Sequence, residues 1–174
     1  KKLVASGVLD VETAEQKESY KTSELPEWAK KTVGLSALQH HACEQVLASL
    51  DAQKFSPYLL HGVTGSGKTE VYIEAVRGAL ERGRGALIIV PEIALTPQLI
   101  DRFRARVGVD IAVLHSGLPK RVRWDSWRAL IEGRCTVAIG ARSGIFAPVA
   151  KLGLIIVDEE HDGSYKQSEG LRYH

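Results

Sequence analysis

Apolar residues recur along this chain in two alternating patterns. Continuous apolar runs, typical of strands buried on both faces, occupy residues 86–90, 111–114, 136–139 and 153–157. Apolar positions at three- and four-residue spacing, typical of helices, fall at residues 38–50, 71–80 and 123–131. Thr96 followed by Pro97 predicts one more helix, with Thr96 as its N-cap. The alternation predicts an α/β fold, a mostly parallel sheet with helices on both faces.

The amino-terminal segment does not show this alternation of strand and helix patterns. It is polar and charged, and Leu25-Pro26 is typical of a linker boundary because proline restricts the residue before it. We expect the end of a helix at residues 1–7 and a short strand at residues 8–13. We interpret residues 1–28 as the tail of a preceding domain plus a linker, and residues 29–174 as one α/β lobe. The chain contains no Met, even at position 1, which favours a piece of a longer protein.

A glycine-rich loop carries the clearest chemistry. Residues 62–69 read GVTGSGKT, the P-loop pattern, between an apolar run at 58–60 that we predict to be a strand and the helix expected after it. Glycines let backbone N–H groups surround a phosphate, and a helix N-terminus adds positive potential. Lys68 can neutralise charge on the phosphates, and the Thr69 hydroxyl can ligate Mg²⁺. The predicted nucleotide-binding residues here are Gly62, Thr64, Gly65, Ser66, Gly67, Lys68, Thr69 and Glu70.

A second group of polar residues follows the last apolar run. Asp158, Glu159 and Glu160 come directly after residues 154–157, so carboxylates stand at the end of a core strand. A P-loop enzyme needs one acid to hold Mg²⁺ and another to orient and deprotonate the attacking water. We assign Asp158 to the metal, together with Thr69, and Glu159 to the water. Lys68, Asp158 and Glu159 are the predicted catalytic residues.

Composition excludes several classes of protein. With 23 Lys and Arg against 21 Asp and Glu among 174 residues, the chain is neither histone-like nor strongly acidic. Two distant cysteines exclude a disulfide scaffold and a Cys-rich zinc site. No apolar stretch approaches the ~20 residues that span a bilayer, so we expect a cytoplasmic protein without a membrane partner. Residues 101–142 are locally basic, with four acids against nine basic residues: Arg102, Arg104, Arg106, Lys120, Arg121, Arg123, Arg128, Arg134 and Arg142.

Several motifs together resemble a known family. Asp158-Glu159-Glu160-His161 combined with the P-loop resembles the DExH class of superfamily 2 helicases. Within that class, further segments are similar to motifs of the primosomal replication-restart DNA helicases, namely residues 89–98, 114–118, 139–148, 157–167 and 172–174. The resemblance runs from about Leu35 to the end of the chain.

This resemblance implies a fold and a function. The lobe would be a RecA-like P-loop NTPase lobe, the first motor lobe of the helicase, incomplete at its carboxyl-terminal end and preceded by a winged-helix and linker remnant. Family members use ATP and Mg²⁺, move three-prime to five-prime along DNA, and act in primosome assembly and the restart of stalled forks. Implied partners are forked and single-stranded DNA, other primosome proteins, single-stranded-DNA-binding protein and the replicative helicase loader. The zinc of full-length members would lie outside this chain.

The resemblance also directs attention to residues that face DNA or the base of ATP. Thr96 begins a helix whose free N–H groups can hold a phosphate. Arg142 lies in a loop directly after a strand, where contact with DNA and a structural ion pair are both open. Tyr165 can stack on an unpaired base or pack inside the lobe. Gln39 is similar in position to an adenine-sensing glutamine, or is a helix-capping partner. The family motifs add His115, Ser116 and Ser143 to the predicted DNA-binding residues.

Three other functions remain open from the residues alone. They are a different superfamily 2 DNA translocase, a P-loop kinase of small molecules, and a non-catalytic module in which nucleotide gates partner contacts. The resemblance places the arginine finger of the reaction on a second lobe outside this chain, and such a group is worth about a thousandfold or more in rate. We therefore expect the isolated chain to bind ATP but to hydrolyse it poorly.

Overall fold

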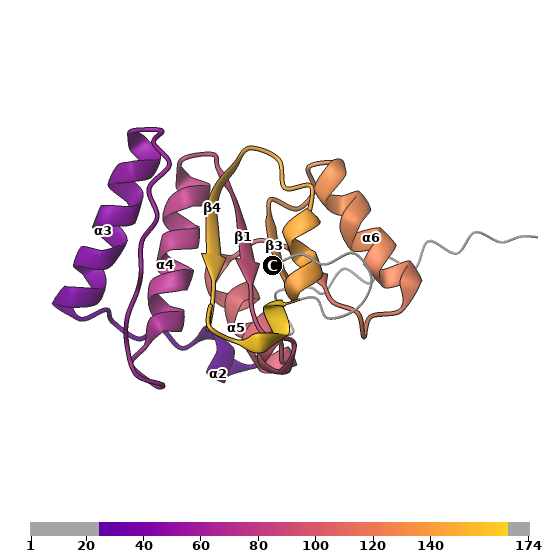
Figure 1. Cartoon of the computed structure of the whole chain (residues 1–174), viewed down its shortest axis with the longest axis horizontal. Coiled ribbons are helices and arrows are strands. Elements are labelled where there is room, and N and C mark those ends of the chain that lie inside the picture. Colours follow the sequence, from indigo (N-terminus) through magenta and orange to yellow (C-terminus); the bar gives the residue numbers. More distant parts are fainter. Residues whose placement is uncertain (1–24, 167–174) are drawn as a thin grey trace, which may run out of the picture.

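The computed structural model describes residues 25–166. Within that range, strands form one sheet in the order β2-β3-β1-β4, and all pairings are parallel (Figure 1). The strands are β1 (Gly85–Ile89), β2 (Ile111–Leu114), β3 (Val137–Gly140) and β4 (Leu152–Val157). In the register, Gly140 lies opposite both Ile89 and Leu114, and Val157 lies opposite Ile89. The carboxyl ends of the strands therefore meet at one edge of the sheet, and the loops that follow the four strands begin there.

Helices connect the strands. They are α2 (Glu27–Lys30), α3 (Ala37–Asp51), α4 (Lys68–Glu81), α5 (Pro97–Val107) and α6 (Lys120–Ile131), with 3-10 turns η2 (Glu92–Ala94), η3 (Arg142–Phe146) and η4 (Gly163–Tyr165). The start of α5 is as predicted: Thr96 is the N-cap, its hydroxyl accepts a hydrogen bond of 3.3 Å from the Leu99 amide, and Pro97 follows. None of the helices in the described range has the length and apolarity needed to cross a bilayer.

The sheet is covered on both faces, which confirms the predicted α/β class. On one face, Ile88 packs with Ile73 of α4 and Phe103 of α5. On the other face, Leu87 packs with Leu130 of α6. Because successive residues of a strand point to opposite faces, the continuous apolar run of β1 supplies both clusters. A further helix, α3, packs against α4 on the side away from α6 (Figure 1).

Predicted and observed element boundaries agree closely in the core. The strand predicted at residues 111–114 has the bounds of β2, and the other three apolar runs match β1, β3 and β4 to within one residue at each end. Two helices begin earlier than the apolar spacing indicated, α4 at Lys68 and α6 at Lys120. Their first turns carry polar side chains that face solvent or a cavity, so apolar periodicity could not detect them.

One predicted strand is wrong. Residues 58–60 form no strand, and the side chain of Leu59 is 77% exposed. An extended segment becomes a strand only when a neighbour completes its backbone hydrogen bonds, and β4 pairs with β1 alone among the described residues. β4 is also an edge strand of the described sheet. Its residues Ile155 and Val157 are about half exposed, although the run was predicted to be buried on both faces.

The described part of the predicted linker belongs to the lobe. Leu25 and Ala29 are buried, and α2 packs against α5. Leu25, which lies before the boundary expected at residue 29, is thus already part of the packed lobe. The predicted helix end at 1–7, the strand at 8–13 and the motif at 172–174 lie outside the described residues, as does most of the expected winged-helix and linker segment.

Candidate nucleotide site

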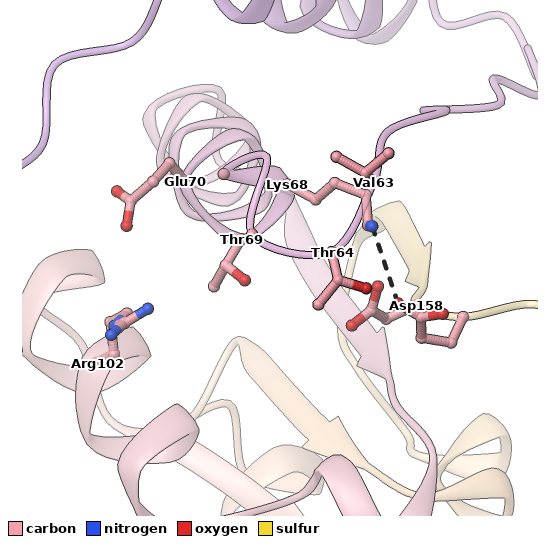
Figure 2. A pocket seen from close by; sticks show the side chains of 10 residues that line it. Val63, Thr64, Lys68, Thr69, Glu70, Arg102 and Asp158 are labelled. Atoms are coloured by element: carbon pink, nitrogen blue, oxygen red, sulfur yellow. Dashed lines mark ion pairs between the residues drawn. The ribbon is translucent and has the colours of Figure 1, made fainter.

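A cavity of about 270 Å³ opens beside the carboxyl edge of the sheet. The P-loop and the start of α4 form one wall, the residues after β4 form another, and α5 contributes one side chain (Figure 2). Lys68 and Asp158, which are 90 positions apart in the sequence, line this same cavity. The cavity residues are Val63, Thr64, Gly65, Gly67, Lys68, Thr69, Glu70, Arg102, Asp158 and Glu159.

The P-loop has the backbone shape that its glycines allow. Gly65 and Gly67 adopt φ values of 81° and 84°, in the left-handed region where side chains are strained. Gly67 is the N-cap of α4 and offers no side-chain acceptor, so the first amides of the helix stay available to an anion. The Lys68 ammonium donates a hydrogen bond of 2.8 Å to the Gly62 carbonyl, which holds its charge over the loop.

Two tyrosines fix the position of Asp158. The Tyr72 hydroxyl, on α4, donates a hydrogen bond of 2.9 Å to Oδ1 of Asp158. The Tyr165 hydroxyl donates one of 2.6 Å to the backbone carbonyl of Asp158, and the Asp158 amide donates to Ile89 of β1 at 2.9 Å. Burial, reinforced by the Asp158 charge, raises the pKa of both phenols above the usual range, so both remain donors at neutral pH.

Glu159 lies next to the P-loop lysine. Its Oε1 is 3.8 Å from Nζ of Lys68, the ion pair drawn as a dashed line in Figure 2, and its Oε2 is 3.5 Å from Nε2 of His161. The backbone of Glu159 has φ 48°, a left-handed conformation that a non-glycine residue adopts at a cost of about 1–3 kcal/mol. Such strain is typical of functional turns, and here it directs the carboxylate into the cavity.

Gln39 connects the N-terminal cap of α3 to the P-loop through hydrogen bonds. It completes a capping box, because its Oε1 accepts a hydrogen bond of 2.7 Å from the Ser36 amide and the Ser36 hydroxyl accepts one from the Gln39 amide. Its Nε2 donates to the Ser66 carbonyl at 2.9 Å. The capping alternative is therefore present in the structure, with an added contact to the P-loop, and Gln39 does not line the cavity.

The cavity fits a nucleotide phosphate chain with Mg²⁺. A Cβ at Gly67 would lie 2.6 Å from Nε2 of Gln39, so a side chain at this turn of the loop would disturb the Gln39 contact. Thr69 and Asp158 bring a hydroxyl and a carboxylate to the same space, and Mg²⁺ prefers such oxygen ligands. Lys68 supplies the cation that phosphates require. The donor set thus suits a polyanion and a hard divalent cation together.

The predicted DNA-binding residues share the same edge of the sheet. Thr96 follows β1, His115 and Ser116 follow β2, and Ser143 follows β3. Thr96, Ser116 and Ser143 are exposed, whereas His115 is partly buried. The Ser116 hydroxyl donates a hydrogen bond to Glu92, which ties the loop after β2 to η2. These residues therefore gather on one side of the lobe, outside the cavity itself.

Arg142 and Tyr165 have structural contacts in the lobe. Nη1 of Arg142 donates to the carbonyls of Ser164 at 3.0 Å and Lys166 at 2.8 Å, so it joins the loop after β3 to the loop after β4. Tyr165 is 6% exposed and belongs to the core cluster beneath α6. Its ring is packed in the lobe, the alternative left open from the sequence, and in this position it offers no free face to a base.

Two residues at the site, Tyr72 and Arg102, were not predicted from the sequence as site residues. Tyr72 lies four positions after Lys68, on the same side of α4, and this spacing could have indicated it. Arg102 was counted only among the basic residues of 101–142, because its place in the cavity depends on how α5 packs against α4. Next to it, a salt bridge joins Arg106 of α5 to Glu70 of α4; both side chains are largely buried, 8% and 13% exposed.

Comparison with known proteins finds one matching family. The model for "DEAD/DEAH box helicase" matches residues 36–173. Among individual proteins, the chain is 48% identical over 147 residues to "Replication restart protein PriA" of Bacillus subtilis, covering 83% of this chain and 18% of the relative. It is 49% identical over 154 residues to the protein of that name from Synechocystis, covering 88% and 17%. It is 48% identical over 143 residues to the protein of that name from Treponema pallidum, covering 82% of this chain and 21% of the relative. The chain spans about a fifth of the length of these relatives.

Proposed function

The chain belongs to the DEAD/DEAH box helicase family, and from that premise we propose that it is the ATP-binding lobe of a DNA helicase that restarts stalled replication forks. The family supports helicase and ATPase chemistry in general, and the names of the relatives support replication restart. The observation that carries the proposal is the cavity, where the P-loop meets Asp158 and Glu159.

The phosphate-binding residues and the acids of the cavity have separate roles in this proposal. The P-loop amides and Lys68 hold the phosphates of ATP, and Thr69 and Asp158 hold Mg²⁺. The metal, when bound, neutralises charge that develops on the phosphates. Glu159 orients the attacking water and takes its proton, and its second oxygen lies 3.5 Å from Nε2 of His161. Tyr72 and Tyr165 keep Asp158 in place.

The DNA strand would lie along the carboxyl edge of the sheet. The amino-terminal amides of α5, at Thr96, suit a backbone phosphate, and the exposed hydroxyls of Ser116 and Ser143 suit further phosphate oxygens. His115 and Arg142 belong to the same surface. Arg142 orders the loop that holds Tyr165. Tyr165 in turn contacts Asp158, so DNA bound at this edge could change the position of Asp158 through that loop.

The wider setting follows the relatives. We propose forked and single-stranded DNA as the substrates, movement in the three-prime to five-prime direction, and other primosome proteins, single-stranded-DNA-binding protein and the replicative helicase loader as partners in the cytoplasm. By itself the chain binds ATP and hydrolyses it slowly, because the transition-state arginine would come from a second lobe. Rapid DNA-stimulated hydrolysis by the isolated chain would contradict that part of the proposal.

A pair of matched substitutions tests the proposal. In the longer protein that contains this lobe, Glu159→Gln is expected to bind ATP and to lose hydrolysis stimulated by forked DNA, together with unwinding of the fork. Glu160→Gln is the control, because it makes the same charge change at a neighbouring exposed carboxylate that does not line the cavity. Unwinding by Glu159→Gln at the control's rate would show that Glu159 does not activate water.

A further inference from the structure

Arg102 reaches the nucleotide cavity from a different element than the other cavity residues. It lies in the middle of α5, whereas the rest of the lining comes from the P-loop, the first turn of α4 and the end of β4. In Figure 2 its guanidinium points from α5 toward Thr69 and Glu70. Neither the P-loop motif nor the acidic strand end assigns a role to this arginine.

The neighbouring charges leave the guanidinium of Arg102 available to a ligand. Glu70 is engaged by Arg106, one turn further along α5, and Asp101 lies 4.0 Å from Arg104. Within residues 25–166, Arg102 forms no ion pair with a carboxylate, and its side chain is exposed. The cation thus faces a cavity in which Lys68 is the other positive side chain.

The helix holds the base of this side chain in a fixed place. Ile100 and Phe103, on either side of Arg102, are buried in the core, and the Thr96 cap and the Arg106 salt bridge secure the ends of the helix. The planar N–H groups of a guanidinium match two oxygens of one phosphate, so less freedom is lost for each hydrogen bond formed than with a lysine. Arg102 and Thr69 line the same cavity, in which the phosphate chain would lie.

Resting on the proposed function, we infer that Arg102 binds phosphate oxygens of the nucleotide and is a second cationic contact besides Lys68. The basic character of residues 101–142 is then shared between two ligands. Arg102 serves the nucleotide, whereas Arg106 pairs with Glu70 and Arg142 donates to backbone carbonyls of the loop after β4. Arg102 also brings α5, which begins at the proposed DNA-phosphate contact of Thr96, into direct contact with ATP.

Binding measurements on the chain test this inference. The dissociation constant of ATP with Mg²⁺ is measured by calorimetry for the native chain, Arg102→Ala, Arg102→Lys and the control Arg128→Ala, which removes another exposed arginine, on α6, that does not line the cavity. Inorganic tripolyphosphate is then titrated as a competitor, because it offers phosphates without base or sugar. Arg102→Ala is expected to weaken both ligands about tenfold or more, with partial recovery in Arg102→Lys and no change in Arg128→Ala.

Two results would overturn the inference. Unchanged ATP affinity in Arg102→Ala excludes any contact, and weakened ATP with unchanged tripolyphosphate means that Arg102 touches the base or the sugar instead. Lys68→Ala, measured in parallel, separates this inference from the proposed function. If Lys68→Ala abolishes binding while Arg102→Ala has no effect, only the role of Arg102 fails. If Lys68→Ala binds ATP like the native chain, the nucleotide site itself fails.

Discussion

The Tyr72 hydroxyl donates a hydrogen bond of 2.9 Å to Oδ1 of Asp158, and so links the P-loop helix directly to the acid at the end of β4. Tyr72→Phe removes this bond without leaving an unpaired group on the ring. Because partners of metal ligands typically contribute tenfold or more to metal affinity, the Mg²⁺ concentration needed for half-maximal ATP binding is expected to rise about tenfold. Calorimetric titrations of ATP at increasing Mg²⁺ concentration measure this requirement.

The control for Tyr72 is another tyrosine whose hydroxyl is hydrogen-bonded elsewhere. Tyr58 bonds Ser49 at 2.6 Å and the Gln45 carbonyl at 3.0 Å, and it does not line the cavity. Tyr58→Phe should leave the Mg²⁺ requirement unchanged, and ATP binding in the presence of a chelator should be the same in both variants. Equal Mg²⁺ requirements in Tyr72→Phe and the native chain would contradict the positioning role.

Gly67 is expected to tolerate no side chain. Gly67→Ala places a Cβ 2.6 Å from Nε2 of Gln39 on a residue with φ 84°. The left-handed conformation alone costs about 1–2 kcal/mol, which corresponds to a fall of about 2–8 °C in melting temperature for a domain of this size. The altered loop should also bind ATP more weakly. Gly34→Ala is the control, since a Cβ there meets no atom within 4 Å. Equal melting temperatures and affinities in the two variants would exclude this strain.

The fold should lose stability at alkaline pH. Burial raises the pKa of Cys43 to about 11, from an ordinary value of 9.0, and raises the pKa of Tyr72 and Tyr165. These groups lose their protons more readily in the unfolded chain, so unfolding releases protons above about pH 9. The contribution is fully present below that pH and declines as the pH rises toward about 11. Urea denaturation at a series of pH values measures the decline, which should be shallower in Tyr72→Phe. A urea denaturation midpoint that stays constant across this pH range would contradict the raised pKa values of these buried groups.

Arg142 is expected to order the loop after β4. Arg142→Ala removes the hydrogen bonds to the carbonyls of Ser164 and Lys166. The backbone amides of residues 163–166 should then exchange with deuterium faster, by at least about tenfold, because local opening costs less without these bonds. Hydrogen exchange followed by mass spectrometry reports this segment. Arg134→Ala, which removes an exposed arginine paired with Glu132, should leave exchange of the segment unchanged. Equal exchange in both variants would argue against the ordering role.

The sequence was sufficient for elements whose signals are local. β2 was predicted with its observed bounds because a run of four apolar residues is bounded by polar ones, and the start of α5 followed from Thr96 and Pro97. The P-loop was equally local, since its glycines and Lys68 are consecutive. In each of these cases the residues that define the element also make its interactions.

The sequence failed where a feature depends on a distant partner. Residues 58–60 are apolar enough for a strand, but no described strand pairs with them. Arg102 enters the cavity only because α5 packs against α4, which no spacing reveals. Gln39 and Arg142 carry polar groups whose partners, at Ser66 and at Ser164, could not be chosen from the sequence.

The most direct test of the shared site is calorimetric titration of ATP with Mg²⁺ into the native chain, Lys68→Ala, Asp158→Asn and the double variant, each first shown to fold by its melting temperature. Both side chains line one cavity, so both are expected to act on one bound nucleotide. Each single substitution should weaken binding about tenfold or more, and the double variant should lose less than the product of the two effects. Either single variant binding with the native affinity would contradict a common site for the two residues.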